Sequence, residues 1–451
     1  MLNTLYLPEL REMLQHQDAE GLRVFCETLH PSRTADFMAG LTSSEQWRVI
    51  QPAELDTRTL IFSFLDWDQQ IQIVSEEDLG EVALVIADLP SDDRVDLLND
   101  VDPAIVKRLL DLLPVEERRD IMRLSQYPEG TAGAVMTTDV VRLKIDGTVR
   151  SALDELADQA NDSEMVYYLF VVDEGNFLRG VVSARELVSA MRHPDQLLSE
   201  IMKTDLIAAR VMDDQEKVAE LVARIDLLAI PIVDDRGRLL GIVTHDDIID
   251  VVLEEATEDA QQMAAVQPLE DSYMRTSVFE LSWKRGVWLA ILFLCSLFTA
   301  VALQQFQGEV LPWMIAFIPL VISSGGNSGS QSATLIITAM SRGDVSLKDW
   351  KKVVAREINM GLLLGGALAL MGLATMYMFP TVLAEGSFAK FVVPLTLFLI
   401  VMAGTLTGSV LPLVFNKIGW DPAIMSNPLV AGIMDVLGIV IYVKVATLIL
   451  T

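Results

Sequence analysis

The chain has 451 residues, of which 51% are hydrophobic, and a net charge of −29. Residues 1–271 carry 23 Lys and Arg against 55 Asp and Glu, whereas residues 272–451 carry 11 against 8. Such an acidic excess argues against binding to nucleic acid, which rewards clustered Lys and Arg. Attraction of cations and ordinary acidic solubility explain it equally well. The four histidines are scattered and no nucleophile–base–acid set is evident, so we expect no enzyme.

Residues 1–130 are predicted to form a cytoplasmic helical domain. Leu and Val recur at three- and four-residue spacing between short turns rich in Pro, Ser and Asp. The turn LPSDDR at 89–94 recurs in type as LPVEER at 113–118, and a proline in the first turn followed by acids favours a helix start. The pattern predicts stacked helical hairpins, an all-α, solenoid-like domain.

Residues 131–199 and 200–253 contain a repeat that predicts two related α/β domains. FVVD at 170–173 leads to GVVSAREL at 180–187, and IVDD at 232–235 leads to GIVTHDDI at 241–248. These segments resemble a tandem pair of CBS domains. That resemblance implies a regulatory module for ATP or another adenine nucleotide, with Thr244 and Asp247 facing the ribose and phosphates. The same two residues fit a helix-capping box as well, and Ser183 with Glu186 fits the capping box better.

A run of acids at 246–259 contains no Lys or Arg. Positions 247, 250, 254 and 258 share one stripe of a helix, where like charges repel. A bound cation and a solvated acidic face are both compatible with this pattern. Oxygen ligands without Cys or His favour Mg²⁺ or Ca²⁺ over zinc or copper. We expect an acidic connecting helix over 254–275.

Residues 276–451 are predicted to be a transmembrane domain of five helices. Four stretches lack charge, at 286–307, 310–341, 358–384 and 391–416, and a fifth at 422–450 is interrupted only by Asp435 and Lys444. Each is long enough for one span of about 20 residues. Lys and Arg gather before the first span and between the second and third. The positive-inside rule therefore places the amino-terminal domains in the cytoplasm and the carboxyl terminus outside.

The second apolar stretch has a polar, glycine-punctuated centre that includes Asn327 and Gln331. Gly325-x-x-x-Gly329 fits a helix-packing face. Polar groups at membrane depth are also tolerated where a segment lines a watery path, and the two amides go beyond what packing needs. Glu357 and Asp421 lie near cytoplasmic helix ends, where ordinary solvation accounts for them.

Asp435 lies well inside the last apolar stretch. An ionised carboxylate at this depth costs a few kcal/mol even on the gentler insertion scales, so it should face a cavity, a partner or an ion. Lys444, the other charge in this stretch, lies nine positions further along, about 13 Å away on a helix, and can extend toward the membrane surface. Asp435 is therefore the candidate functional acid.

The whole arrangement resembles the MgtE family of magnesium transport proteins over essentially the full length. Four segments carry the resemblance: YPEGTAGAVMT at 127–137, EATED at 255–259, GGNSGSQSATLI at 325–336, and DPAIMSNPLV at 421–430 leading to Asp435.

That resemblance implies a homodimeric Mg²⁺ channel with its pore on the two-fold axis. Asp435 would be the selectivity acid, and the route would be lined by Asn327, Gln331, Asn427 and Ala431. Mg²⁺ bound by cytosolic acids would close the channel, with Asp92 and Asp93 able to exchange roles. By position, these acids are Asp92, Asp96, Asp214, Glu216, Asp226, Asp247, Asp250, Glu255, Glu258 and Asp259.

The sequence thus predicts a Mg²⁺-selective uptake channel in the inner (plasma) membrane of a prokaryote, with the lipid bilayer, Mg²⁺ ions and a second copy as its partners. The alternative is an ion-coupled secondary transporter of divalent cations with nucleotide-sensing CBS domains.

Overall fold

The computed structural model describes residues 5–160, 163, 165–269, 273–378, 388–424 and 427–450. The chain divides into two compact units, Met1–Val252 and Leu253–Thr451, and each is considered by itself.

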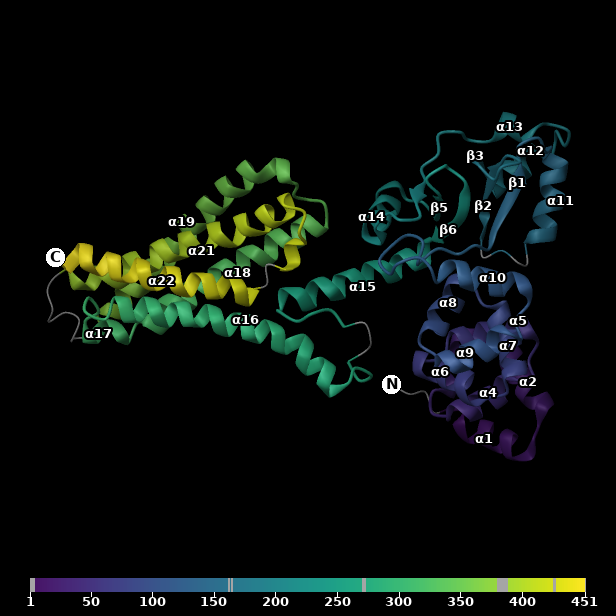
Figure 1. Cartoon of the computed structure of the whole chain (residues 1–451), viewed down its shortest axis with the longest axis horizontal. Coiled ribbons are helices and arrows are strands. Elements are labelled where there is room, and N and C mark those ends of the chain that lie inside the picture. The colour runs from purple at the N-terminus through teal and green to yellow at the C-terminus, as the bar shows by residue number, and fades with distance from the viewer. Residues whose placement is uncertain are drawn as a thin grey trace. The chain divides into compact units, whose positions relative to one another are not determined.

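The first unit begins with a stack of short helices, as the sequence predicts (Figure 1). Aspartate or threonine side chains cap several of them, and Thr42 with Glu45 forms a complete capping box. Most helices contact the one two positions further along the chain, such as α5 with α7 and α6 with α8, which is the packing of a solenoid. The helices are α1 (Leu7–His16), α2 (Ala19–Thr28), α3 (Pro31–Met38), α4 (Ser43–Ile50), α5 (Leu55–Ser63), α6 (Trp67–Glu76), α7 (Leu79–Asp88), α8 (Ser91–Asn99), α9 (Pro103–Leu110) and α10 (Val115–Leu124).

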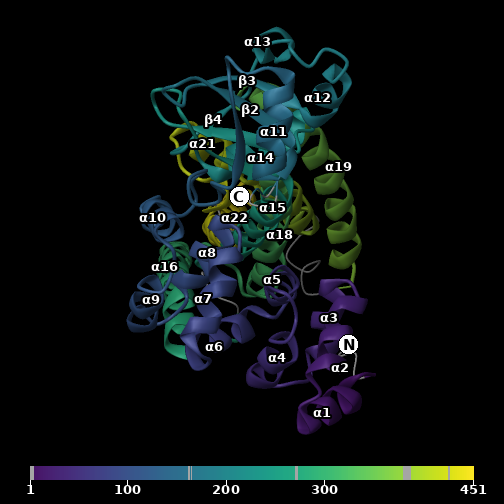
Figure 2. The same cartoon turned by 90° about the vertical axis from the view of Figure 1, so that its right-hand side faces the viewer.

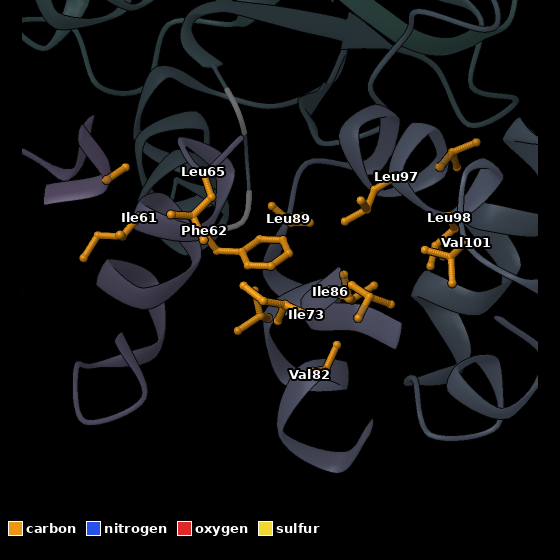
Figure 3. Packing of buried hydrophobic residues seen from close by; sticks show 14 of the residues in the cluster. Ile61, Phe62, Leu65, Ile73, Val82, Ile86, Leu89, Leu97, Leu98 and Val101 are labelled. Carbon is orange, nitrogen blue, oxygen red and sulfur yellow. The ribbon is translucent and has the colours of Figure 1, made fainter. Parts of the chain in front are cut away.

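The core of this helical stack is continuous and well filled. Figure 3 shows the ring of Phe62 pointing between the side chains of Ile73, Ile86 and Leu89. Phe62 and Ile86 are 0% exposed. Burying a side chain of this kind contributes about 1.5–3 kcal/mol, so the core holds the acid-bearing helix α8 in a fixed frame.

The repeat forms two three-stranded sheets of identical topology. In each sheet the first strand pairs parallel with the second, and the second pairs antiparallel with the third. Helices α11 and α12 lie beside the first sheet in both views (Figures 1 and 2). The strands are β1 (Val140–Lys144), β2 (Met165–Val172), β3 (Leu178–Ser183), β4 (Ala209–Arg210), β5 (Ala229–Val233) and β6 (Leu239–Thr244). The helices are α11 (Val149–Gln159), α12 (Ala184–Ala190), α13 (Leu198–Ile201) and α14 (Gln215–Ile225).

The acidic run lies on one helix, α15 (His245–Met263), which starts directly after β6. It therefore begins nine residues before the connecting helix that we expected over 254–275, and it ends well before residue 275. The Asp247 carboxylate accepts from the Thr244 backbone N–H at this junction, so the strand can turn straight into the helix. The residues of α15 from Leu253 onward belong to the second unit.

The second unit is a bundle of long helices. Four of them are long and apolar enough to cross a membrane, judged over the described residues: α16, α19, α21 and α22. Helix α18 has 24 residues, about 36 Å, but its polar centre keeps it outside that set, so five spans stay a prediction. The elements are α16 (Val278–Gln305), α17 (Pro312–Ile315), α18 (Ile318–Ser341), η1 (Leu347–Asp349), α19 (Trp350–Met376), η2 (Ala389–Phe391), α21 (Val392–Lys417), η3 (Pro422–Ile424) and α22 (Asn427–Leu450).

The helix boundaries differ from the charge-free stretches in two places. The stretch 310–341 is broken into α17 and α18, because Pro319 favours a new helix start. Helix α19 starts at Trp350, before its apolar part, and carries Lys and Arg in its first two turns. The end of the expected third span, 379–384, lies outside the described residues.

Candidate functional site

Helices α18 and α22 pack side by side and run antiparallel. A side-chain carbon added at Gly326 would lie 3.2 Å from Cβ of Ala431. Further toward the end of α18, Ser330 and Thr334 contact Asn427 at the start of α22. The pair of helices therefore has a fixed register along which polar residues can be placed.

Hydrogen bonds fix Asn427 against α18. Ser330 Oγ donates to the Asn427 carbonyl at 3.0 Å, and Thr334 Oγ1 donates to the Asn427 side-chain oxygen at 3.0 Å. Ala431 and Asp435 follow at four-residue spacing, so the three residues share one stripe of α22. This stripe brings together three of the residues that the sequence predicts along the route.

Asp435 has no hydrogen bond or ion pair to any residue in the described part of the chain. Its side chain is neither fully buried nor fully exposed. The α18–α22 register places it about level with Ile322, which shares an apolar cluster with Val436. An unpaired carboxylate at this depth is costly unless water or a cation reaches it.

Asn327 and Gln331 lie on the exposed face of α18. The Asn327 amide donates to Ser323 Oγ at 3.3 Å, one turn away, so the face is polar over more than one turn. Among the residues that the structure describes, the Asn327 and Gln331 side chains form no hydrogen bond to another helix.

Gly325 and Gly329 of α18 pack closely against the neighbouring helix α21. A side-chain carbon at Gly408 of α21 would lie 2.0 Å from the Gly329 carbonyl, and one at Gly404 would lie 2.7 Å from the Gly325 carbonyl. Backbones can approach this closely only where side chains are absent. The packing interpretation of the glycines is confirmed, whereas the watery path beside the exposed amides stays a prediction.

Glu357 was expected to be solvated, and that expectation is wrong. It lies on α19, is 8% exposed, and its Oε2 accepts a 2.8 Å hydrogen bond from Ser332 Oγ of α18. The backbone carbonyl of Glu357 also accepts from Thr405 Oγ1 of α21. A buried carboxylate thus links α19 to the helix that carries Asn327 and Gln331.

The acidic end of α15 lies against the end of α18 and the segment that leads into α22. Ser341 Oγ donates to Asp259 Oδ2 at 2.9 Å, and Met263 packs with Ala333 and Ile337 of α18. Partial burial raises the pKa of both Glu258 and Asp259, and the charge of Asp421 adds to each rise. Glu255 raises the pKa of Glu258 further. Asp421 is solvent-exposed, as expected, and its charge also acts on this acid group.

A second acid group lies in the first unit, where α8 meets the start of α15. Desolvation raises the pKa of Asp93 to about 6, and the charges of Asp247, Asp246 and Asp250 contribute to that rise. Burial likewise raises the pKa of Asp247. Asp93 is thus the α8 acid on which these charges act, although its side chain is solvent-exposed, as that of Asp96 is, whereas Asp92 is buried.

The remaining expected acids lie at the ends of α14. Asp214 caps its amino terminus and pairs with Lys217 Nζ at 3.5 Å. Glu216 lies in its first turn, and Asp226 ends the helix in a left-handed conformation with φ of 56°. All three are exposed, which leaves their carboxylates accessible.

Thr244 and Asp247 form the capping arrangement. Asp247 Oδ2 accepts from the Thr244 backbone N–H at 3.2 Å and from its hydroxyl. Thr244 is 1% exposed, so a nucleotide would have to displace these hydrogen bonds to reach it. Ser183 and Glu186 form a complete capping box, as predicted.

Among the described residues, no three Asp, Glu, His or Cys side chains are already arranged around a common metal position. The raised carboxyl pKa values nevertheless fit groups that gain from a neighbouring cation, because like charges crowd without Lys or Arg between them. The apolar helices of the second unit and the CBS-type pair of the first together define a multi-pass membrane protein with a large domain outside the bundle.

Comparison with known families agrees. Residues 318–445 match the MgtE model, described as a divalent cation transporter, residues 29–130 match the MgtE intracellular N domain, and residues 132–193 and 198–254 match the CBS domain. The Magnesium transporter MgtE of Thermus thermophilus is 36% identical over 331 residues, which cover 72% of each chain. The chain belongs to the MgtE family.

Two solved structures resemble the amino-terminal part at 35% identity. The soluble part of a magnesium transporter covers 55% of this chain and 97% of its own, with a TM-score of 0.52. The cytosolic domain of the Mg²⁺ channel MgtE in complex with ATP covers 54% and 98%, with a TM-score of 0.50.

Proposed function

We propose that this chain is a Mg²⁺-selective channel for Mg²⁺ uptake. The observation that carries the proposal is Asp435, a carboxylate without a partner among the described residues on a helix long and apolar enough to span a membrane. Mg²⁺ sheds its water reluctantly and is held by few carboxylates while hydrated. In a homodimer with the pore on its axis, two Asp435 side chains hold one hydrated ion.

The other residues of the route supply neutral oxygens. Asn327 and Gln331 expose amides on α18, and Asn427 and Ala431 share a stripe of α22 with Asp435. Neutral acceptors can hydrogen-bond the water shell without binding the ion too tightly to release it. Selectivity then follows from pore width and acceptor placement.

Uptake by cells that lack other Mg²⁺ routes tests the proposal. Asp435→Ala abolishes Mg²⁺-dependent growth, whereas Leu437→Ala, two positions further on the same helix, leaves it intact. Asp435→Glu retains part of the flux because it keeps the charge. Growth of the Asp435→Ala strain equal to that of wild type, with equal membrane expression, would refute the proposal.

Mg²⁺ in the cytosol closes the channel in this proposal. The acids proposed to bind it are Asp92, Asp96, Asp214, Glu216, Asp226, Asp247, Asp250, Glu255, Glu258 and Asp259, and the geometry adds Asp93 and Asp421. A ligand shifts a conformational equilibrium only through its different affinity for the two states. Several weak sites together supply the roughly 5.5 kcal/mol that a swing from 99% open to 99% closed requires.

The proposed location is the inner membrane of a prokaryote, with domains 1–130, 131–199 and 200–253 in the cytoplasm and the carboxyl terminus outside. Support comes from the basic residues at the start of α19, which favour the cytoplasmic side. A cysteine-labelling experiment on intact cells tests this orientation.

The CBS pair is proposed to bind an adenine nucleotide. The 35% identity to a cytosolic domain solved in complex with ATP supports a site of this kind. Calorimetry with ATP, in the presence and absence of Mg²⁺, tests it with Thr244→Val as the variant. The alternative of ion-coupled transport predicts that currents vanish without a Na⁺ or H⁺ gradient, whereas a channel conducts without either.

A further inference from the structure

One exposed face of α19 is basic and polar at its start and apolar further along. Positions 352, 356, 359, 363, 366 and 370 are spaced by four and three residues and therefore form one stripe. The stripe begins with Lys352, Arg356 and Asn359, all exposed. It continues with Leu363, which is 71% exposed, and Leu370, which is 70% exposed. At Gly366 an added side-chain carbon would meet nothing within 4 Å.

The opposite face of α19 packs against α21. Side-chain carbons added at Gly361, Gly365 and Gly372 would lie 2.5 Å from Met402, 3.0 Å from Phe398 and 2.7 Å from Leu397, all on α21. Helix α19 is thus packed against α21 along its length. The stripe necessarily faces away from the bundle.

The cations at this end of α19 have few acids near them. The side chains of Arg342, Lys348, Lys351 and Arg356 are exposed and form no hydrogen bond or ion pair with any described residue. Lys352 alone pairs with an acid, Asp349, at 2.9 Å. This grouping stands out in a chain with 63 acids and 34 bases, where a free cation could readily find a carboxylate.

An aromatic residue marks the level of this group. Trp350 is 52% exposed, and Lys351 Nζ lies 5.6 Å from the centre of its ring. Exposed tryptophan beside Lys and Arg is typical of the boundary between lipid tails and headgroups. Tyr377 occupies the far end of the same helix and is 59% exposed, so the apolar stripe lies between two aromatic boundaries.

We propose that this stripe is a binding site for an anionic phospholipid. The headgroup phosphate contacts Arg356 and Lys352, with Lys351 and Lys348 nearby, and the acyl chains lie along Leu363, the gap at Gly366 and Leu370. Arg offers several N–H donors in a fixed fork that matches phosphate oxygens. Basic residues next to a membrane span each add about 1 kcal/mol of attraction to an anionic leaflet, roughly fivefold in affinity. The site does not depend on which ion the channel conducts.

Lipid retention by the purified full-length protein tests the site. The protein is reconstituted with equal dioleoyl-phosphatidylglycerol and dioleoyl-phosphatidylcholine, extracted in mild detergent, and its bound lipids are counted by native mass spectrometry. Wild type retains phosphatidylglycerol preferentially. The double variant Lys352→Gln/Arg356→Gln lowers phosphatidylglycerol affinity by roughly 30-fold, as expected for two cations. The control Arg285→Gln/Lys417→Gln removes two exposed cations from other helices and keeps the preference.

Two outcomes overturn the proposal. Equal phosphatidylglycerol retention by wild type and Lys352→Gln/Arg356→Gln places the lipid elsewhere. Efficient disulfide cross-linking of Leu363→Cys between two copies in the bilayer shows that a second chain, and no lipid, covers the stripe. Absence of this cross-link, together with the loss of retention, supports the site.

Discussion

Ser332 on α18 donates a 2.8 Å hydrogen bond to the buried carboxylate of Glu357 on α19. Gln331, the neighbour of Ser332, is exposed on α18. This hydrogen bond therefore joins α18, which carries the polar segment, to α19, whose opposite face is directed away from the bundle. No other hydrogen bond between side chains of α18 and α19 is found in the described part of the bundle.

Removing the donor should cost more than neutralising the acceptor. Ser332→Ala leaves a buried carboxylate without its hydrogen bond, at a cost of about 1–3 kcal/mol. Glu357→Gln keeps an acceptor oxygen and the volume, so it should be as stable as wild type. Thermal unfolding in detergent measures both variants. Adding Ser332→Ala to Glu357→Gln should cost less than Ser332→Ala alone, and equal costs would contradict a direct interaction.

The two glycine environments predict opposite effects of the same substitution. Gly408→Ala places a methyl group 2.0 Å from the Gly329 carbonyl, so α18 and α21 must separate, at a cost of about 1–3 kcal/mol. Gly366→Ala meets open space and replaces a poor helix former, a gain of roughly 0.5–1 kcal/mol. Expression and thermal midpoint compare them. Equal loss in both variants would mean that α18 and α21 do not cross at these glycines.

The α22 stripe could be predicted from the sequence because the spacing of residues along a helix determines which of them share a face. Asn427, Ala431 and Asp435 are four residues apart, and any helix places them on one face. The acids of α15 were predictable for the same reason. Thr244 and Asp247 also predicted the start of α15, and their hydrogen bonds confirm the contact between them, whereas a nucleotide role for the same residues stays a prediction.

The residues that sequence reasoning missed depend on contacts between distant helices. Glu357 looked like a cytoplasmic end residue, and only the crossing of α18 and α19 brings Ser332 to it. Asp421 joins Glu258 and Asp259 through the docking of α15 against the ends of α18 and α22. The hydroxyls of Ser332 and Ser341 were the available signal, since a hydroxyl in an apolar helix needs a partner.

Acidification should substitute in part for Mg²⁺ in the first unit. The pKa of Asp93 is raised to about 6 from 3.8, so the folded state binds this proton more tightly than the unfolded state does. The penalty for ionising Asp93 is absent below about pH 4 and complete above about pH 6. Lowering the pH from 7.5 to 5.5 without Mg²⁺ should therefore raise the thermal midpoint, by about 2–4 °C after allowance for solvent screening.

Asp93→Asn is the matching variant for this prediction. It lacks the titrating group, so its midpoint should depend less on pH and should lie above that of wild type at pH 7.5. Asp111→Asn, at an exposed acid of the same unit whose charge is not among those that act on Asp93, should keep the wild-type dependence. An unchanged pH dependence in Asp93→Asn would show that other groups titrate.

Shutdown by internal Mg²⁺ should depend on the acids at the end of α15 and spare conduction. Glu258 is repelled by Glu255, Asp259 and Asp421, and Asp259 is repelled by Asp421. A bound cation relieves this repulsion only while α15 stays docked. Neutralising the three to Gln, Gln and Asn should raise the Mg²⁺ concentration for half-closure by roughly tenfold or more, within the usual range of coupling energies, with unchanged single-channel conductance in patch recordings. Asp344→Asn, an exposed acid in the loop after α18, should leave both unchanged. Unaltered Mg²⁺ sensitivity in the triple variant would remove α15 from the closing mechanism, because the acids would then repel without any consequence for the closed state.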